Sequence, residues 1–214
     1  MSTYKFNQLE VVNGNKKLGK DTLIFNLGSA SECPSKKLGL CLIPDEKCYA
    51  LKAEKMYPGC LPYRQRQSEY WLSNTAEQIF HDFKGLLIKY KALKKRVKYL
   101  RFNESGDFHN QSCVYKLSVI AGKLFNEFNI TTYGYTARKD LSFNSVNFLA
   151  KGSSHIQGNN GICIARKLAK KEYPKGKARA YHENGIKYVS CIGSCFACKL
   201  CKVDSKINIV IALH

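Results

Sequence analysis

The sequence predicts an α/β fold with a mostly parallel sheet, of which a partial (β/α) barrel is one form. Apolar, β-branched stretches alternate with amphipathic helical stretches along the middle of the chain, in the order typical of parallel α/β proteins. No internal repeat and no low-complexity linker interrupts the 214 residues. We therefore expect one α/β domain that covers residues 1–214, with metal-binding loops at 29–60 and 191–201.

Each expected element rests on a local pattern. Thr22–Leu27 is an apolar run, which predicts the first confident strand. Asn74–Tyr90 is the clearest helix, because Asn74 is a favourable N-cap, Glu77 follows three residues later, and the apolar residues form one stripe. The remaining expected elements are a helix at Cys48–Met56, a strand at Val97–Asn103, a helix at Ser112–Phe128, and strands at Ile130–Thr136, Val146–Ala150, Gly161–Ala165, Lys187–Ser190 and Ile207–Leu213.

Four cysteines lie within eleven residues near the C-terminal end, spaced C-x3-C-x2-C-x2-C: Cys191, Cys195, Cys198 and Cys201. Thiols at such short intervals are typical ligands of one inorganic centre. Closely successive ligands suit a [4Fe-4S] cluster, as in bacterial ferredoxins. Zinc more often takes two C-x2-C pairs well apart in sequence, and zinc on these four thiolates is the alternative.

A second group of cysteines falls in the irregular stretch Ser29–Cys60, at Cys33, Cys41 and Cys48. Long loops without secondary structure are uncommon unless they are functional or held in place, and metal ligation would hold this one. Cys60 stands apart from the group and is expected to be a buried thiol. The sequence leaves open which cysteines are ligands, and whether the two groups serve one centre or two.

The composition is strongly basic, with 35 Lys and Arg against 16 Asp and Glu and a formal net charge of +19. Such charge indicates nucleic-acid binding, although a Lys-rich surface from an AT-rich coding genome is an alternative, and a thiolate-bound cluster would be offset by some of these cations. No apolar run approaches a membrane span, so we expect a cytoplasmic protein with no membrane partner. In that compartment ten cysteines favour metal ligation over disulfides.

Polar residues follow the expected strands at their carboxyl ends, where parallel α/β proteins bind ligands. Glu104, Asp107 and His109 follow one strand, Arg138 follows the next, and Lys151–His155 the one after. A right-handed crossover places such ends on the same edge of the sheet. We therefore expect a cleft for a small-molecule substrate, with the carboxylates or His109 moving a proton and Arg138 positioning an anionic or carbonyl group. The alternative is an ion pair that only ties the loops together.

Four stretches carry a resemblance to a known family: Cys33–Ala50, Tyr63–Gln67, Leu100–Phe108 and Tyr133–Leu141. They resemble the mycobacteriophage gene 88 proteins, and the likeness extends from about Leu23 to Cys201. The resemblance implies a phage or viral origin and no particular activity.

A more distant likeness is to the radical S-adenosylmethionine enzymes, through the Cys48-Tyr49-Ala50 motif and the polar strand ends. It implies a partial-barrel fold. The chain departs from that family's C-x3-C-x2-C ligand motif near the N-terminus, because its first three cysteines are spaced C-x7-C-x6-C.

These observations lead to a functional hypothesis. We expect a phage or viral protein, in the host cytoplasm or the virion, that binds a [4Fe-4S] cluster beside a catalytic cleft and performs redox or Lewis-acid, hydrolytic chemistry. The alternatives are a metal-stabilised nucleic-acid-binding protein, and a hydrolase whose cluster or zinc ion is purely structural.

Overall fold

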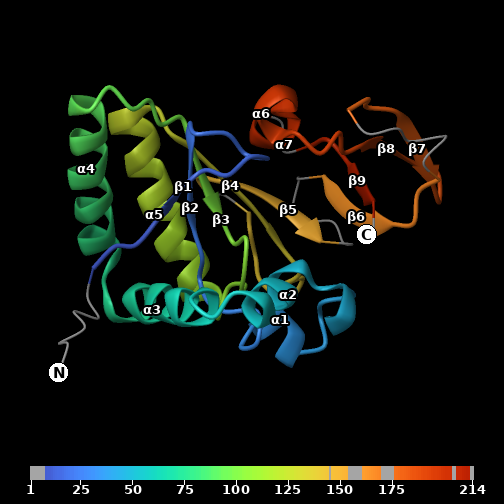
Figure 1. Ribbon diagram of the computed structural model, residues 1–214, viewed down its shortest axis with the longest axis horizontal. Coiled ribbons are helices and arrows are strands. Elements are labelled where there is room, and N and C mark those ends of the chain that lie inside the picture. Colours follow the sequence, from blue (N-terminus) through green and yellow to red (C-terminus); the bar gives the residue numbers. More distant parts are fainter. Residues whose placement is uncertain (1–7, 145, 154–160, 170–175, 204–205, 213–214) are drawn as a thin grey trace.

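A nine-stranded sheet with the order β1-β2-β3-β4-β5-β6-β9-β8-β7 runs through the protein (Figure 1). The computed structural model describes residues 8–144, 146–153, 161–169, 176–203 and 206–212. The strands are β1 (Val12–Asn13), β2 (Thr22–Phe25), β3 (Tyr99–Phe102), β4 (Thr131–Thr136), β5 (Leu149–Ser153), β6 (Ile162–Arg166), β7 (Ala180–Glu183), β8 (Ile186–Ser190) and β9 (Ile209–Ala212).

The expected mostly parallel α/β sheet is confirmed. Strands β2, β3, β4, β5, β6, β9 and β8 pair in parallel, and only β1 and β7 are antiparallel to their neighbours. From β2 to β6 the sheet order follows the chain order. Among the described strands β1 and β7 each have a neighbour on one side only, so the sheet is open and a barrel is not confirmed.

The longer helices cover one face of the sheet, and short helices lie elsewhere (Figure 1). Helices α4 and α5 pack against each other, and α5 also packs on β4, whereas α7 contacts β4 near the cysteine-rich C-terminal segment. The helices are α1 (Pro34–Lys37), the 3-10 helix η1 (Asp45–Lys47), α2 (Tyr49–Met56), α3 (Cys60–Ser73), α4 (Ala76–Ala92), α5 (Gln111–Phe128), α6 (Cys195–Cys198) and α7 (Leu200–Val203).

Alternation along β3 gives the two faces of the sheet different chemistry. Successive side chains of a strand point to opposite faces. Leu100 and Phe102 therefore enter the main apolar core beneath the helices, beside Phe25 of β2. Arg101 lies between them in sequence and points to the other face, where its guanidinium carbon is 4.4 Å from the Tyr135 ring centroid. The face without α4 and α5 is therefore the polar one.

Most of the expected elements are present, with shifts that have local causes. Helix α4 begins with a capping box of Thr75 and Gln78, because the Asn74 side chain instead donates to the Tyr70 carbonyl at the end of α3. Strand β5 begins three residues later than expected, since the Asn147 backbone N–H and side-chain amide bond to Ser118 on α5.

Some expectations concern segments outside this description, and others were incomplete. Ser154, His155 and Leu213, which closed an expected polar loop and an expected strand, lie outside the described residues. The 29–60 segment, expected to be irregular up to a helix at Cys48, also contains α1 and η1. Strand β7 and helix α3 were not predicted. None of the described helices is both long and apolar enough to cross a membrane.

A close backbone approach joins the loops that follow β2 and β3. Gly106 has φ +71°, and a Cβ atom there would lie 2.7 Å from the Gly28 carbonyl oxygen and 2.8 Å from its nitrogen. A side chain at this position therefore meets backbone, which has little freedom to move.

We expect Gly106→Ala to lower the free energy of unfolding by more than the roughly 1 kcal/mol that alanine loses in the left-handed region. Gly39→Ala is the matched control, because Gly39 has φ +65° and open space around the added methyl group. Urea unfolding of both variants measures the difference. Equal losses would contradict the close-packing argument.

Candidate functional site

A pocket of about 180 Å³ lies at the carboxyl ends of β3, β4 and β5, and we call it the strand-end pocket. Its floor comes from the residues that follow β3 and end β4, and its remaining wall comes from the loop that carries α1 and η1. It is lined by Ala30, Cys33, Ser35, Lys36, Cys41, Ile43, Cys48, Tyr49, Ala50, Asn103, Glu104, Ser105, Gly106, Asp107, Tyr135, Thr136, Ala137 and Ser153.

All three cysteines of the N-terminal group line this pocket. Cys33 is the N-cap of α1 and is followed by Pro34 at the first helical position; Cys48 is the N-cap of α2. Burial raises the pKa of Cys33 to about 11, and the nearby Asp107 carboxylate adds to that shift. Across the described residues, no three Cys, His, Asp or Glu side chains are arranged to hold a single metal ion.

Asp107 is buried and accepts four hydrogen bonds. Its donors are the Ser35 hydroxyl at 2.5 Å, the Thr136 hydroxyl at 2.7 Å, and the backbone N–H groups of Ala137 and Phe108, both at 2.8 Å. Burial raises the pKa of this carboxyl, and the four hydrogen bonds oppose that rise. Asp107 thereby ties the cysteine loop to the ends of β3 and β4.

Arg138 and His109 lie beside the pocket without lining it. The Arg138 guanidinium forms a bidentate pair with Asp140, at 2.8 and 2.7 Å, and also donates to the carbonyls of Phe108 and His109. The His109 ring contacts the Leu27 carbonyl through Nε2 at 3.1 Å, so that nitrogen donates. The loops after β3 and β4 do meet, and Arg138 holds them together, whereas His109 joins the loop after β3 to the loop after β2.

Glu104 and Asn103 line the pocket, and each side chain has hydrogen-bonding atoms that the described residues leave unused. One Glu104 carboxylate oxygen accepts from the Asn15 amide at 3.0 Å, and its backbone carbonyl accepts from the Tyr49 hydroxyl. Asn103 has φ +58° and uses its side-chain oxygen to accept from the Leu27 N–H. Its buried amide nitrogen has no acceptor among the described residues. The pocket thus holds one buried donor whose hydrogen bonds are not made within the described chain.

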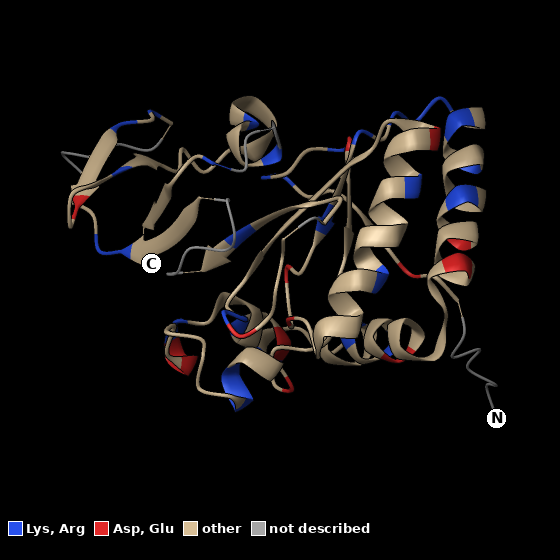
Figure 2. Cartoon of the chain, turned by 180° about the vertical axis from the view of Figure 1, so that it is seen from behind, with Lys and Arg blue, Asp and Glu red and all other residues tan. Residues whose placement is uncertain are grey.

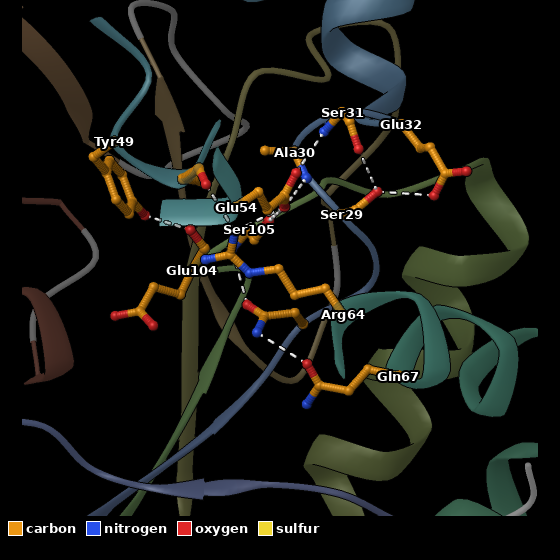
Figure 3. Close-up of polar contacts among 12 residues, drawn as sticks. Ser29, Ala30, Ser31, Glu32, Tyr49, Glu54, Arg64, Gln67, Glu104 and Ser105 are labelled. Atoms are coloured by element: carbon orange, nitrogen blue, oxygen red, sulfur yellow. Dashed lines mark hydrogen bonds and ion pairs between the residues drawn. The ribbon is translucent and has the colours of Figure 1, made fainter. Parts of the chain in front are cut away.

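A buried ion pair fixes the cysteine loop over the strand ends (Figure 3). Arg64 of α3 donates to Glu54 of α2 at 2.7 Å, and both side chains are at most 6% exposed. Glu54 also accepts from the backbone N–H groups of Ala30 at 2.6 Å and Ser31 at 3.1 Å, and Arg64 donates to the Ala50 carbonyl. Three segments, the Ala30–Ser31 stretch, α2 and α3, are therefore joined at one carboxylate and one guanidinium.

The same network reaches the strands through two amides. The Asn26 side chain, just after β2, donates to Gln67 of α3 at 3.0 Å and accepts from the Ser105 backbone N–H at 2.8 Å (Figure 3). The Ser105 hydroxyl lies 3.3 Å from Glu54. The loop, the helices and the strand ends therefore share one buried polar network.

The C-terminal cysteines line a different and smaller pocket, of about 30 Å³, which we call the sheet-face pocket. It lies on the polar face of the sheet, under α6 and α7. Tyr135 lines both pockets, and its hydroxyl donates to the Cys201 sulfur. The other lining residues are Arg101, Tyr133, Val189, Ser190, Cys191, Ile192, Ser194, Cys195, Cys198, Lys199, Leu200, Lys202 and Ile209.

Cations gather around the sheet-face pocket. Lys202 and Lys151 are both 1% exposed, and the Lys202 ammonium nitrogen lies 4.4 Å from the Tyr99 ring centroid. Burial raises the pKa of the Cys201 thiol, while the Tyr135 hydrogen bond, Lys151 and Arg101 lower it. Arg101 and Lys202 were not predicted as site residues, and Lys151, expected to follow a strand, lies within β5. The signal for Arg101 was a cation in the middle of an otherwise apolar strand.

Basic residues also lie on the outer surface. Figure 2 shows Lys and Arg along α4 and α5 and on strands at the far end of the sheet. One exposed group spans the last turn of α4 and the turn that follows it: Lys89, Lys91, Lys94, Lys95 and Arg96. Nucleic-acid binding by these residues stays a prediction.

The sequence matches the Gene product 88 family over residues 6–154, more than half of the chain. The chain belongs to the Gene product 88 family. Every residue that lines the strand-end pocket falls within the match, whereas the four C-terminal cysteines follow it. No curated protein and no solved structure matches the chain. The family expected from the motifs is confirmed.

The Glu54–Arg64 pair predicts a large effect of removing one partner. We expect Glu54→Gln to lower the free energy of unfolding by about 3–5 kcal/mol, because Arg64 is left buried without its counter-charge. Glu77→Gln breaks an ion pair with Lys123 whose side chains are 61% and 38% exposed, and should cost less than about 1 kcal/mol. Chemical denaturation measures both, and equal losses would contradict the role given to Glu54.

The same pair has a pH signature. Burial raises the pKa of Glu54, but hydrogen bonds from Ala30, Arg64 and Ser31 together lower it by more than burial raises it. The pKa of Glu54 therefore lies below its ordinary value. Its stabilising contribution is therefore fully present above the unfolded-state pKa of about 4.3 and is lost as pH falls through the lower folded-state pKa. The stability difference between wild type and Glu54→Gln should shrink over that acid range.

Proposed function

We propose that this chain is an iron–sulfur enzyme in which Cys33, Cys41 and Cys48 hold a [4Fe-4S] cluster in the strand-end pocket. One observation carries the proposal: three thiols from separate turns of one loop line a single pocket at the carboxyl ends of parallel strands. That edge of a parallel sheet is where α/β proteins bind their ligands.

The donor set and the space fit a cluster. A [4Fe-4S] core has its ligands on separate irons, so its thiolates do not converge on one point. Cys33, Cys41 and Cys48 come from separate turns of one loop and line one pocket, which suits ligands on separate irons. The volume of about 180 Å³ exceeds by roughly tenfold the 10–15 Å³ that one water molecule needs, which leaves room for a core of this size and a small ligand.

With three cysteine ligands, one iron of such a cluster would have no protein ligand and would supply Lewis acidity to the substrate. The chain itself supplies the recognition. The Asn103 amide nitrogen is a buried donor without an acceptor among the described residues, and an unmade hydrogen bond of this kind costs about 1–3 kcal/mol until a ligand makes it. We therefore propose a small polar substrate that carries a carbonyl or carboxylate oxygen.

The four expected catalytic residues take different roles in this proposal. Glu104 lines the pocket, and only one of its carboxylate oxygens has a hydrogen-bond partner among the described residues, so it is the group that moves a proton. Asp107, with all of its capacity used by four donors, positions the cysteine loop. Arg138 joins the loops that follow β3 and β4, and His109 joins the loop after β3 to the loop after β2.

The test is anaerobic purification and reconstitution, followed by iron and acid-labile sulfide analysis of single cysteine variants. Cys33→Ala, Cys41→Ala and Cys48→Ala should each lose most of the about four irons and the accompanying sulfide. Cys60→Ala is the matched control, because Cys60 belongs to the same segment, begins α3 and lines neither pocket. The electron paramagnetic resonance spectrum of the reduced protein identifies the cluster type.

Two results would overturn the proposal. One is wild-type protein that takes up no sulfide on reconstitution. The other is unchanged iron and sulfide content in all three variants.

A further inference from the structure

We infer that Cys191, Cys195, Cys198 and Cys201 form a second, separate site, which holds a single divalent metal ion of the zinc class through four thiolates. This inference stands independently of the proposed cluster, because the two cysteine groups line different pockets. The observations that carry it are the backbone path, the size of the pocket and the charge of its walls.

The backbone brings the four thiols together within a short stretch. Cys191 follows β8, and its N–H donates to the Val210 carbonyl of β9 at 2.8 Å, which fixes the start of the segment to the sheet. Cys195 and Cys198 begin and end the single turn α6. Lys199 then has φ +59°, so the chain reverses direction and Cys201 returns in α7 to the same pocket.

The pocket is too small for a four-iron cluster. Its volume of about 30 Å³ is room for one or two water molecules. A [4Fe-4S] core contains eight atoms before its ligands are counted, whereas a zinc ion with four sulfur ligands at about 2.3 Å occupies little more than the space between the sulfurs. This reverses, for these four cysteines, the expectation of a cluster.

The walls of the sheet-face pocket carry positive charge and unused hydrogen-bond donors, which favour an anionic ligand. The Arg101 Nε atom and the Tyr133 hydroxyl are buried and have no hydrogen-bond partner among the described residues. The Lys202 ammonium group donates to the Leu18 carbonyl at 3.0 Å and to the Thr22 hydroxyl at 2.8 Å, but the Asp21 carboxylate lies 3.8 Å away, so its charge has no close counter-charge there. Four neutral thiols do not offset these groups. A divalent ion with four thiolates carries a net charge of about −2 and also presents sulfur acceptors to the unmade donors.

The thiols must move to bind an ion. As described, they line the pocket without closing on a common point. A cysteine side chain turns about one bond, so closure needs rotation of the thiols together with a movement of α6 and α7. The binding free energy then becomes part of the folding free energy of this segment.

The first test is metal analysis of protein produced in medium that contains both zinc and iron. Wild type should hold about one zinc per chain, and Cys195→Ala and Cys198→Ala should lose it. Cys60→Ala and Cys48→Ala should keep their zinc, which separates this inference from the cluster proposal. Retention of zinc in both C-terminal variants, or loss of iron and sulfide in place of zinc, would overturn the inference.

A second measurement covers the case in which those variants fail to fold. Cobalt(II) bound to the wild-type protein reports its ligands through the sulfur-to-cobalt charge-transfer intensity and the d–d bands of a tetrahedral site. Four thiolates in tetrahedral geometry are expected. A spectrum of an octahedral site, or of one with two thiolates or fewer, would overturn the inference.

Arg101 tests the charge argument. Arg101→Met should weaken zinc retention against a chromophoric chelator by about 10- to 100-fold, the usual effect of removing an outer partner of a metal ligand. Arg96→Met is the control, because Arg96 is exposed and lines neither pocket. Equal zinc affinity in the two variants would show that Arg101 does not balance the charge of this site.

Discussion

The buried pair of Glu54 and Arg64 is the constraint on which the strand-end pocket depends. Removing both charges from water costs several kcal/mol per ion, and this is recovered only if geometry and further hydrogen bonds are good. Glu54 meets that condition through the backbone N–H groups of Ala30 and Ser31, and Arg64 through the Ala50 carbonyl. Ala30 and Ser31 precede the cysteines Cys33–Cys48 in sequence, and Ala50 follows them. The hydrogen bonds that offset the desolvation cost of the ion pair therefore also set the position of the cysteine loop.

The second constraint is the difference between the two faces of the sheet. On one face Phe25, Leu100 and Phe102 complete an apolar core with α3, α4 and α5. On the other, Arg101 lies over Tyr133 and Tyr135, a contact that stabilises a cation but does not neutralise it. A strand that contributes to an apolar core on one side and carries a half-desolvated guanidinium on the other is costly. Such a departure from local consistency is typical of a functional surface.

The sequence predicted the sheet better than it predicted the site. Periodicity and capping found most strands and both long helices, because those signals lie within a few residues of one another. The hydrogen-bond partners of Asp107 and Arg138 were not predictable. Nothing in the sequence marks Ser35 or Asp140 as a partner, and only the folded structure brings them into contact. Cysteine spacing identified both thiol groups, but spacing does not show which pocket each thiol lines. Their separation into two pockets follows from the path of the sheet.

The two sites nevertheless share a wall, and this has an electrostatic consequence. Tyr135 lines both pockets, and Arg101, which lines one of them, interacts electrostatically with Glu104, which lines the other. An anionic four-thiolate centre would attract the Arg101 guanidinium, which also attracts the Glu104 carboxylate. The four C-terminal cysteines would then act, through Arg101 and Tyr135, on a pocket whose lining residues all lie between Ala30 and Ser153.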